Sequence, residues 1–249
     1  MTITDGRPAA LVTGASRGIG LGIARRLADA GYDLTVAARD AARLDKAAAA
    51  LASAGGGVHP VSADMATEDD VRRLAAEHAQ QYGRLDVLVI GAGVGSSGVL
   101  EETTKKRYDL QFDINVRAPF VLLQTSLPML RQTAAANPDH GAKVIALASI
   151  TGVVAEPALS VYGATKAALI SLCRSVNTEE SAHGVSATAI CPGYVNTDMA
   201  SHVRDRIEPH KMIRVDDVAE LAMSVTRLSA FAVVPELIVT RPGEQLWRA

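Results

Sequence analysis

The sequence has little of what several classes of protein require, beginning with cysteine. Its 249 residues include 2 cysteines, Cys173 and Cys191, which have neither the number nor the spacing of a disulfide framework or a zinc site. Both lie in apolar runs, which is typical of core thiols in a reducing compartment. We therefore expect neither a disulfide framework nor a metal site.

An excess of one charge and long apolar runs are also lacking. The 25 basic and 27 acidic residues leave a net charge of -2, which offers no electrostatic footprint for nucleic acid or an anionic membrane. Residues 1–8 hold no charged segment followed by an apolar one, and no apolar run is long enough to span a membrane. We therefore expect a cytoplasmic protein that binds neither nucleic acid nor membranes.

Apolar residues are nevertheless plentiful, at 48% of the chain, and no repeat or linker divides them. We expect a single domain over residues 1–249. Strands are expected at 8–13, 33–38, 58–62, 85–90, 143–148, 185–191 and 236–240, and helices at 21–31, 40–54, 67–82, 103–131, 157–180 and 215–228. Apolar strands that alternate with helices predict an α/β fold, a Rossmann-like, doubly wound parallel sheet covered on both faces.

A glycine-rich turn follows the first expected strand. Its residues are Gly14, Ser16, Arg17, Gly18, Ile19 and Gly20, and the helix behind it would place its positive end against a pyrophosphate. The spacing differs from the common Gly-x-Gly-x-x-Gly fingerprint, and tight packing between strand and helix is the alternative explanation. The position of the turn in the first βαβ unit favours a dinucleotide.

Two arginines indicate which dinucleotide is bound. Where an NAD site would place an acidic residue after the second strand, this chain has Ala38 and Arg39, and Arg17 belongs to the same neighbourhood. Two guanidinium groups suit a 2′-phosphate, which predicts NADP(H). The alternative is that both are solvated surface arginines.

The stretch from Ser149 to Lys166 holds the candidates for chemistry. Ser149 ends an expected strand, and Pro157 is predicted to open the next helix. On that helix Tyr162 and Lys166 are four residues apart and share a face, so the ammonium would favour the ionised phenol. An ordinary solvated helix face would look the same, so the pair needs support from the rest of the chain.

Other short motifs follow one another in order along the chain. Besides the glycine turn, they are Asp64, Asn115 with Pro119-Phe120, Ser149, Tyr162-Gly163-Ala164-Thr165-Lys166, and Pro192-Gly193-Tyr194-Val195-Asn196-Thr197. One such motif is weak evidence, but this many in order are specific. Over nearly its whole length the chain resembles the short-chain dehydrogenase/reductase family, particularly its 3-oxoacyl-acyl-carrier-protein reductase-like and carbonyl reductase-like members.

The resemblance implies roles for the catalytic candidates. Ser149 would hydrogen-bond the substrate carbonyl and Tyr162 would donate a proton to its oxygen. Lys166 would bind the nicotinamide ribose and lower the pKa of the tyrosine. Asn115 would hold a water that links Lys166 to solvent, although a lone asparagine in a helix is usually just polar.

The resemblance also extends the cofactor site. Asp64 and Met65 would contact the adenine, although Asp64 by itself is typical of a helix N-cap. Val195 and Thr197 would clasp the nicotinamide carboxamide. Further cofactor residues on the same rim would be Gly91, Ala92, Gly93, Pro192 and Gly193.

Two segments depart from the family pattern. The chain has Ile90-Gly91-Ala92-Gly93 where the family usually has Asn-Asn-Ala-Gly, so two hydrogen-bonding side chains are lost and we expect reduced activity or cofactor affinity. Residues 234–243 lack the usual Gly-Gly ending, which puts in doubt an oligomer contact there. The resemblance still suggests a homodimer or homotetramer, built partly from the helix that carries Tyr162.

The predicted function is an NADPH-dependent oxidoreductase that interconverts a small or apolar carbonyl compound and its secondary alcohol. A short substrate lid is expected at about 197–215, with Val153, Val154 and Leu159 lining the other side of the pocket or packing in the core. Arginines on the lid are either solvated or meet the phosphate of an acyl carrier or CoA. The alternative functions are an NADP(H)-binding regulator or scaffold with little turnover and, more remotely, a methyltransferase.

Overall fold

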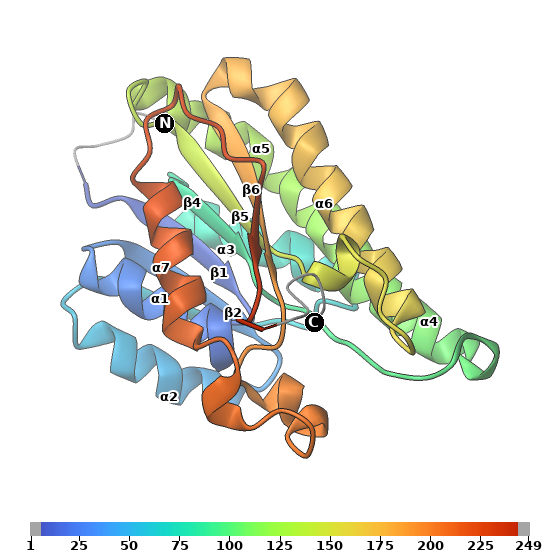
Figure 1. Ribbon diagram of the computed structural model, residues 1–249. Coiled ribbons are helices and arrows are strands. Elements are labelled where there is room, and N and C mark those ends of the chain that lie inside the picture. The colour runs from blue at the N-terminus through green and yellow to red at the C-terminus, as the bar shows by residue number, and fades with distance from the viewer. Residues whose placement is uncertain (1–5, 244–249) are drawn as a thin grey trace.

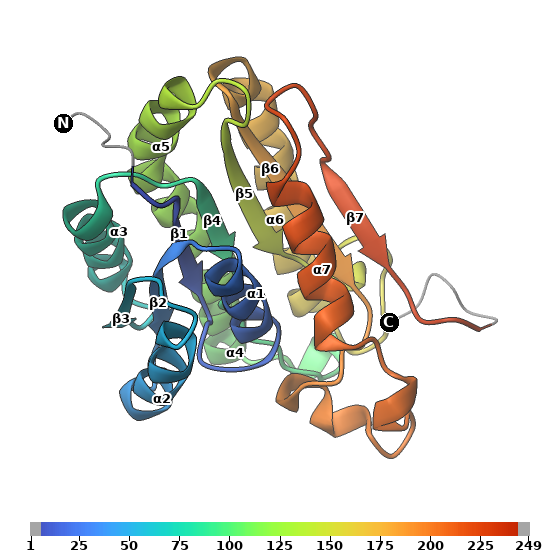
Figure 2. The same ribbon diagram turned by 90° about the vertical axis from the view of Figure 1, so that its left-hand side faces the viewer.

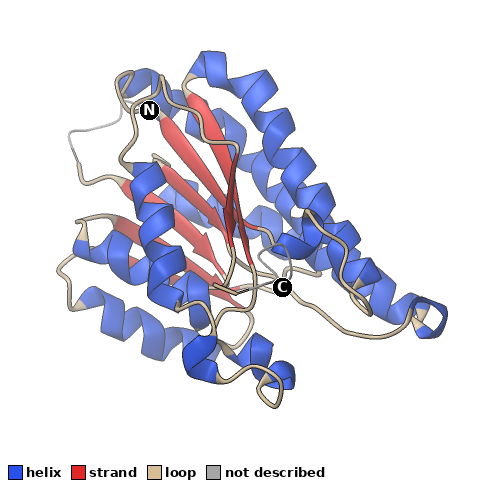
Figure 3. Ribbon diagram, in the orientation of Figure 1, coloured by secondary structure: helices blue, strands red, loops and turns tan. Residues whose placement is uncertain are grey.

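A computed structural model of the chain describes residues 6–243, which form one parallel sheet of seven strands between layers of helices (Figures 1 and 3). The strands are β1 (Ala9–Thr13), β2 (Asp33–Ala38), β3 (Val58–Ser62), β4 (Val87–Ile90), β5 (Ala142–Leu147), β6 (Val185–Pro192) and β7 (Glu236–Val239). The α-helices are α1 (Gly18–Asp29), α2 (Ala41–Ala52), α3 (Glu68–Tyr82), α4 (Lys105–Phe112), α5 (Ala118–Ala136), α6 (Ser160–Glu180) and α7 (Val215–Thr226). The predicted doubly wound fold is confirmed.

The strand order places the crevice that such sheets use for ligands. The order is β3-β2-β1-β4-β5-β6-β7, so the chain runs outward from β1 to β3 and then returns to pair β4 with the other side of β1. Ligands of open α/β sheets bind at the carboxyl ends of the strands, at the point where the order reverses. Here that point lies between β1 and β4.

The two faces of the sheet are covered by different helices. Helices α1 and α7 lie next to each other on one face (Figure 2), where Ile23, Leu27, Val218 and Ala222 share a buried cluster with the strands. Helices α3, α5 and α6 supply the apolar side chains of the other face. The central strands β1, β4, β5 and β6 are buried on both faces, which explains why their sequences are largely apolar rather than alternating.

The helical sequence expected over 103–131 is confirmed from Lys105 onward, with a change of helix type inside it. α4 ends at Phe112, a π-helical stretch covers Asp113–Arg117, and α5 continues to Ala136. The π stretch contains the buried Asn115. Such bulges inside helices are frequent at functional sites because they redirect side chains.

Pro157 does not open α6, so that prediction was wrong. α6 begins at Ser160, and Ala158 has a φ of 61°, the one positive value of a non-glycine residue within 6–243. The carbonyl of Ala158 accepts a hydrogen bond of 2.9 Å from the amide of Gly98. This tertiary bond to the loop after β4 holds a turn where local preference favours a helix.

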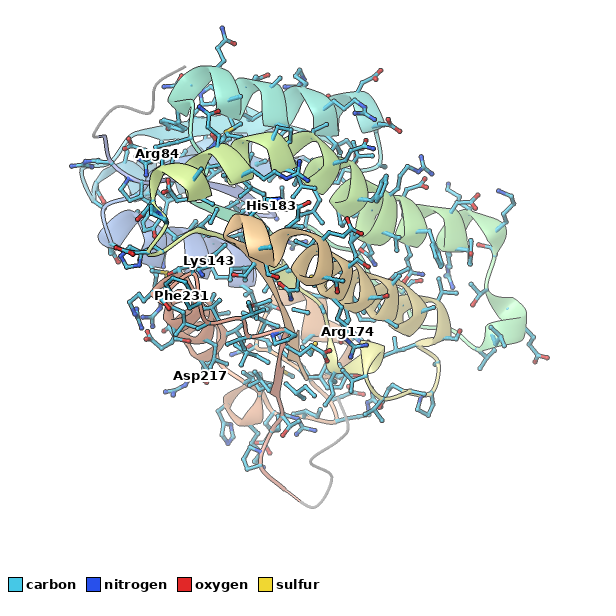
Figure 4. All side chains as sticks on the ribbon, turned by 90° about the horizontal axis from the view of Figure 1, so that it is seen from above. Arg84, Lys143, Arg174, His183, Asp217 and Phe231 are labelled. Carbon is cyan, nitrogen blue, oxygen red and sulfur yellow. The ribbon has the colours of Figure 1, made fainter. Side chains whose placement is uncertain are left out.

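The end of the sheet where the strands begin is viewed in Figure 4. Lys143, at the start of β5, is buried, and its Nζ donates to the carbonyl of Ser229 at 3.0 Å. Phe231, two residues after Ser229 in the chain, is 88% exposed.

Cys173 and Cys191 are both free and buried, which confirms their prediction as core thiols. No helix within residues 6–243 is long and apolar enough to cross a membrane.

Candidate active site

The glycine turn after β1 is packed directly on the end of β4. The hydroxyl of Thr13 accepts hydrogen bonds from the amides of Gly91 and Ala92, at 3.0 and 3.1 Å. Gly14 has a φ of 70°, and a Cβ on it would lie 2.7 Å from the Gly91 carbonyl carbon. Glycine is therefore required at this crossing by the close approach of two backbones. The alternative explanation of the turn as tight packing thus holds for Gly14, alongside any role in binding.

A cleft of about 1450 Å³ opens above the turn, at the reversal point of the sheet. The structure brings all the predicted cofactor residues to its walls: Gly14, Ser16, Arg17, Gly18, Ile19, Gly20, Arg39, Asp64, Met65, Gly91, Ala92, Gly93, Tyr162, Lys166, Pro192, Gly193, Val195 and Thr197. The first turn of α1 has no acidic residue and no side-chain cap. Its amides and the positive helix end are thus suited to a pyrophosphate.

Asp64 lines this cleft and is not a helix cap. α3 begins at Glu68 with Thr67 as its N-cap, and the Asp64 carboxylate accepts from the amide of Ala66 at 3.0 Å. The alternative drawn from the sequence, an N-cap at Asp64, was therefore wrong.

The catalytic candidates Ser149, Tyr162 and Lys166 line the same cleft. The Oγ of Ser149 accepts hydrogen bonds from the amide and the hydroxyl of Thr151, at 3.2 and 2.9 Å. With two acceptor positions filled, the serine proton remains to be donated. The Nζ of Lys166 donates to the carbonyl of Leu147 at 2.7 Å and lies 5.6 Å from the centroid of the Tyr162 ring.

The pKa values of Tyr162 and Lys166 are set by desolvation. It raises the pKa of Tyr162 to about 12, while a hydrogen bond with Ser149 acts in the lowering direction and Tyr194 in the raising one. Desolvation lowers the pKa of Lys166 to about 8. The net shift of the Tyr162 pKa is upward because desolvation is its largest cause, and the predicted influence of Lys166 on the tyrosine stays a prediction.

Asn115 lies behind the cleft and does not line it. Its Oδ1 accepts from the amide of Val94 at 2.9 Å, and its Nδ2 donates to the Val94 carbonyl at 2.8 Å and to the Thr165 hydroxyl at 3.0 Å. Asn115 thus joins the loop after β4 to the helix that carries Tyr162. Its predicted role in holding a water stays a prediction.

The sequence family is decided by a comparison that covers most of the chain. A model of the family described as short chain dehydrogenase matches residues 8–208. The chain belongs to the short-chain dehydrogenase family. The predicted oxidoreductase is thereby confirmed, and the methyltransferase alternative is excluded.

Individual relatives of the chain support its assignment to the short-chain dehydrogenase family. It is 34% identical over 210 residues to the 3-oxoacyl-[acyl-carrier-protein] reductase FabG of Staphylococcus aureus, covering 83% of this chain and 82% of the relative. A short chain dehydrogenase from Burkholderia cenocepacia in complex with NADP is 29% identical with a TM-score of 0.83, covering 96% of this chain and 98% of that one. The RhlG/NADP complex of Pseudomonas aeruginosa is 30% identical with a TM-score of 0.83, covering 96% and 97%. The ligands of both structures agree with the predicted NADP(H).

Gly91 stands where the family usually has an asparagine, and the packing around it leaves no room for a side chain. A Cβ at Gly91 would lie 2.5 Å from the carbonyl oxygen of Thr13, closer than any side chain tolerates. Thr13 meanwhile satisfies the amides of Gly91 and Ala92. The end of β4 is therefore held by close backbone packing, in a space where an asparagine side chain has no room.

Sequence reasoning missed three residues of the cleft. Tyr194 lines the cleft and influences the pKa of Tyr162, and Asp198 lines it beside Thr197. Thr151 orients Ser149. Tyr194 lay within a motif quoted for the family, whereas nothing in the sequence singled out Thr151 or Asp198. Conversely, Val153 is 41% exposed, and neither it nor Val154 lines the cleft, in contrast to Leu159.

The predicted lid is a segment of short helical turns. It contains the 3₁₀ stretches Asp198–Val203 and Pro209–Lys211. Val203 and Met212 are buried in a small cluster of their own with Ala200, whereas Met199 is 53% exposed and lines the cleft. Two of the expected lid residues thus hold the segment together rather than face a substrate. No group of three or more His, Cys, Asp or Glu residues within 6–243 is arranged to hold a metal.

Proposed function

We propose that the protein is an NADP(H)-dependent reductase that interconverts a carbonyl compound and its secondary alcohol. The observation that carries this proposal is the meeting of Ser149, Tyr162 and Lys166 with the glycine turn and Arg39 in one cleft. Bound NADPH would supply a hydride, and the protein would supply a proton, a hydrogen bond and position. The residues that would hold NADP(H) are the cofactor residues already named around the cleft.

Ser149 would donate a hydrogen bond to the carbonyl oxygen, and Tyr162 would donate a proton to it. Because Ser149 Oγ already accepts two hydrogen bonds from Thr151, its proton is free to donate to that oxygen. With a pKa raised to about 12, Tyr162 is protonated at neutral pH and is ready to act as the acid in reduction. The Lys166 ammonium, anchored on the Leu147 carbonyl, contributes positive charge close to the phenol as the proton leaves.

The substrate class we favour is a small or apolar carbonyl compound. The cleft that contains Tyr162 is also lined by Leu159, Tyr194 and Met199, which offer apolar surface. A ketone oxygen would be held by Ser149 and Tyr162 while its carbon substituents contact these side chains.

A second substrate class, 3-oxoacyl thioesters, is supported by two observations. The Staphylococcus aureus relative is named a 3-oxoacyl-[acyl-carrier-protein] reductase. Moreover, the lid residue Arg206 and Arg241 both act on the pKa of Tyr194 in the lowering direction, and Arg241 has a buried Nε without a hydrogen-bond partner. These cations would suit the phosphate that an acyl carrier or CoA places outside the acyl pocket.

The test follows NADPH absorbance with a panel of apolar ketones and 3-oxoacyl thioesters. We expect turnover that falls about a thousandfold in Tyr162→Phe, since a positioned acid is worth about 10²–10⁴. The matched control is Tyr108→Phe, which changes an exposed tyrosine stacked on Phe112. Full activity of Tyr162→Phe would overturn the assignment. Absence of turnover with every substrate would support the regulator or scaffold alternative.

The proposed assembly is a homodimer or homotetramer through α5 and α6. Half-exposed Phe120 and the side chains of Phe112, Ala168 and Leu172 line a shallow apolar hollow of about 470 Å³ between these helices. Ile170, in contrast, packs on the sheet. Light scattering is expected to give a dimer or tetramer that Phe120→Glu dissociates, and a monomeric wild type would rule the assembly out.

A further inference from the structure

An ion pair bridges the mouth of the cofactor cleft. Nη1 of Arg17, in the glycine turn, donates to Oδ2 of Asp198, at the start of the lid, across 2.8 Å. The two residues are 181 positions apart in the chain, and both line the cleft. The turn and the lid also approach each other next to this pair, where a Cβ on Gly18 would lie 3.4 Å from Thr197.

The topology gives Arg17 two possible anionic partners on opposite sides. Arg17 follows β1, Asp198 follows β6, and Arg39 follows β2 on the other side of β1. The site expected for a 2′-phosphate is beside Arg39. In this structure Asp198 already holds Nη1 of Arg17, so a phosphate beside Arg39 would compete with Asp198 for the same guanidinium.

Charge makes the two partners competitors. Asp198 presents a carboxylate and NADP(H) presents a 2′-phosphate, and both form charge-assisted hydrogen bonds with a guanidinium. The side chains of Arg17 and Asp198 are 58% and 68% exposed, so their pairing is weak and reversible. A phosphate beside Arg39 would therefore be able to draw Arg17 away from the lid.

We propose that Asp198 competes with the 2′-phosphate of NADP(H) for Arg17 and so limits how strongly the protein prefers NADPH to NADH. This inference rests on the proposed NADP(H) function. It makes Asp198 a specificity-determining residue that need not touch the cofactor itself. In the free protein the ion pair between Arg17 and Asp198 also links the lid to the glycine turn. The lid is released from this link when the phosphate binds.

The test measures binding, by calorimetry, of NADPH, NADH and the fragments 2′,5′-ADP and 5′-ADP. Because an exposed ion pair is worth about 0.2–1 kcal/mol, Asp198→Asn is expected to tighten NADPH and 2′,5′-ADP by about 1.4- to fivefold. Binding of NADH and 5′-ADP is expected to change much less. Equal tightening of all four ligands, or none, would overturn the proposal.

Two further variants separate the ion pair from general electrostatics. Asp216→Asn removes the same charge from an exposed residue that lines the same cleft, and it is expected to change the NADPH to NADH ratio less than Asp198→Asn does. In an Arg17→Ala background the effect of Asp198→Asn is expected to vanish. An effect that persists without Arg17 would contradict the competition.

The wild-type titrations decide the proposed cofactor separately. If the wild type binds NADPH and NADH equally and Arg39→Ala changes neither, the NADP(H) assignment itself fails. If the wild type prefers NADPH but Asp198→Asn leaves the preference unchanged, only the competition by Asp198 fails.

Discussion

The Lys166 ammonium lies 5.6 Å from the centroid of the Tyr162 ring while it donates to the carbonyl of Leu147 at 2.7 Å. The helical spacing of four residues brings the two side chains to one face, and the end of β5 then holds the ammonium in place. Both groups are desolvated, and their pKa values move in opposite directions, toward about 12 for Tyr162 and about 8 for Lys166. Desolvation thus favours the neutral form of each.

Burial of this ammonium predicts a gain of stability in Lys166→Met. At pH 7 the lysine is protonated in both states, so the folded state bears the full cost of desolvation, and removing it is expected to raise the free energy of unfolding by about 1–3 kcal/mol. Activity would be lost. Urea unfolding at pH 7 measures the change, and exposed Lys46→Met is the control, expected within about 0.5 kcal/mol of wild type. A large loss of stability in Lys166→Met would contradict the prediction.

The same shift predicts how stability depends on pH. Because the pKa of Lys166 is lowered from 10.5 to about 8 in the folded state, the unfolded state binds more protons between these values. Stability contributed by this group therefore rises as the pH increases from about 8 to 10.5. Unfolding experiments across this window should show a smaller rise in Lys166→Met than in wild type. Desolvation of Lys143 lowers its pKa too, so part of the rise should remain in that variant.

The value of kcat/KM is expected to fall with increasing pH for carbonyl reduction and to increase with pH for alcohol oxidation. Carbonyl reduction needs the proton of Tyr162 and the charge of Lys166, so kcat/KM should be level below pH 8 and fall as Lys166 deprotonates above about 8. Alcohol oxidation needs the phenolate and should increase with pH. Profiles of kcat/KM from pH 6 to 10 test this, and reduction that increases above pH 8 would refute it.

Arg39 is expected to carry much of the cofactor preference. Its side chain is exposed at the cleft, and no ion pair of Arg39 is found among residues 6–243. Arg39→Asp would repel a 2′-phosphate and would accept hydrogen bonds from ribose hydroxyls instead. We expect the ratio of kcat/KM for NADPH over NADH to fall at least about tenfold, since a charge-assisted hydrogen bond is worth about 1.5–3 kcal/mol. The neighbouring exposed Arg43→Ala, in which the lost arginine pairs with Asp40, provides the comparison.

Gly91 is expected to be required by packing, so restoring the family's asparagine should be harmful. A methyl group there meets the Thr13 carbonyl at 2.5 Å, and overpacking of this kind costs about 1–3 kcal/mol. Both Gly91→Ala and Gly91→Asn should therefore lower the free energy of unfolding by about that much. At Gly98 a Cβ would lie 3.5 Å from Arg107, so Gly98→Ala is the tolerated control. If Gly91→Asn increased stability and activity together, the close crossing would not be what holds this position.

The sequence by itself determined the parallel sheet, the glycine turn and the residues brought around one cleft. These follow from apolar runs, helical spacing and short motifs, which are local properties of the chain. The asparagine missing at Gly91 was also visible in the sequence, but only the structure showed that Thr13 packs too closely to leave room for one.

Only the tertiary structure decided where α6 begins, what orients Ser149 and which partner Arg17 selects. The first depends on the bond from Gly98 to the Ala158 carbonyl, and the last on a contact between residues 181 positions apart. The pKa of Tyr162 likewise reflects how deeply the phenol is buried, which spacing to Lys166 does not reveal. Desolvation and long-range contacts exist only once distant segments are packed together, so no local pattern encodes them.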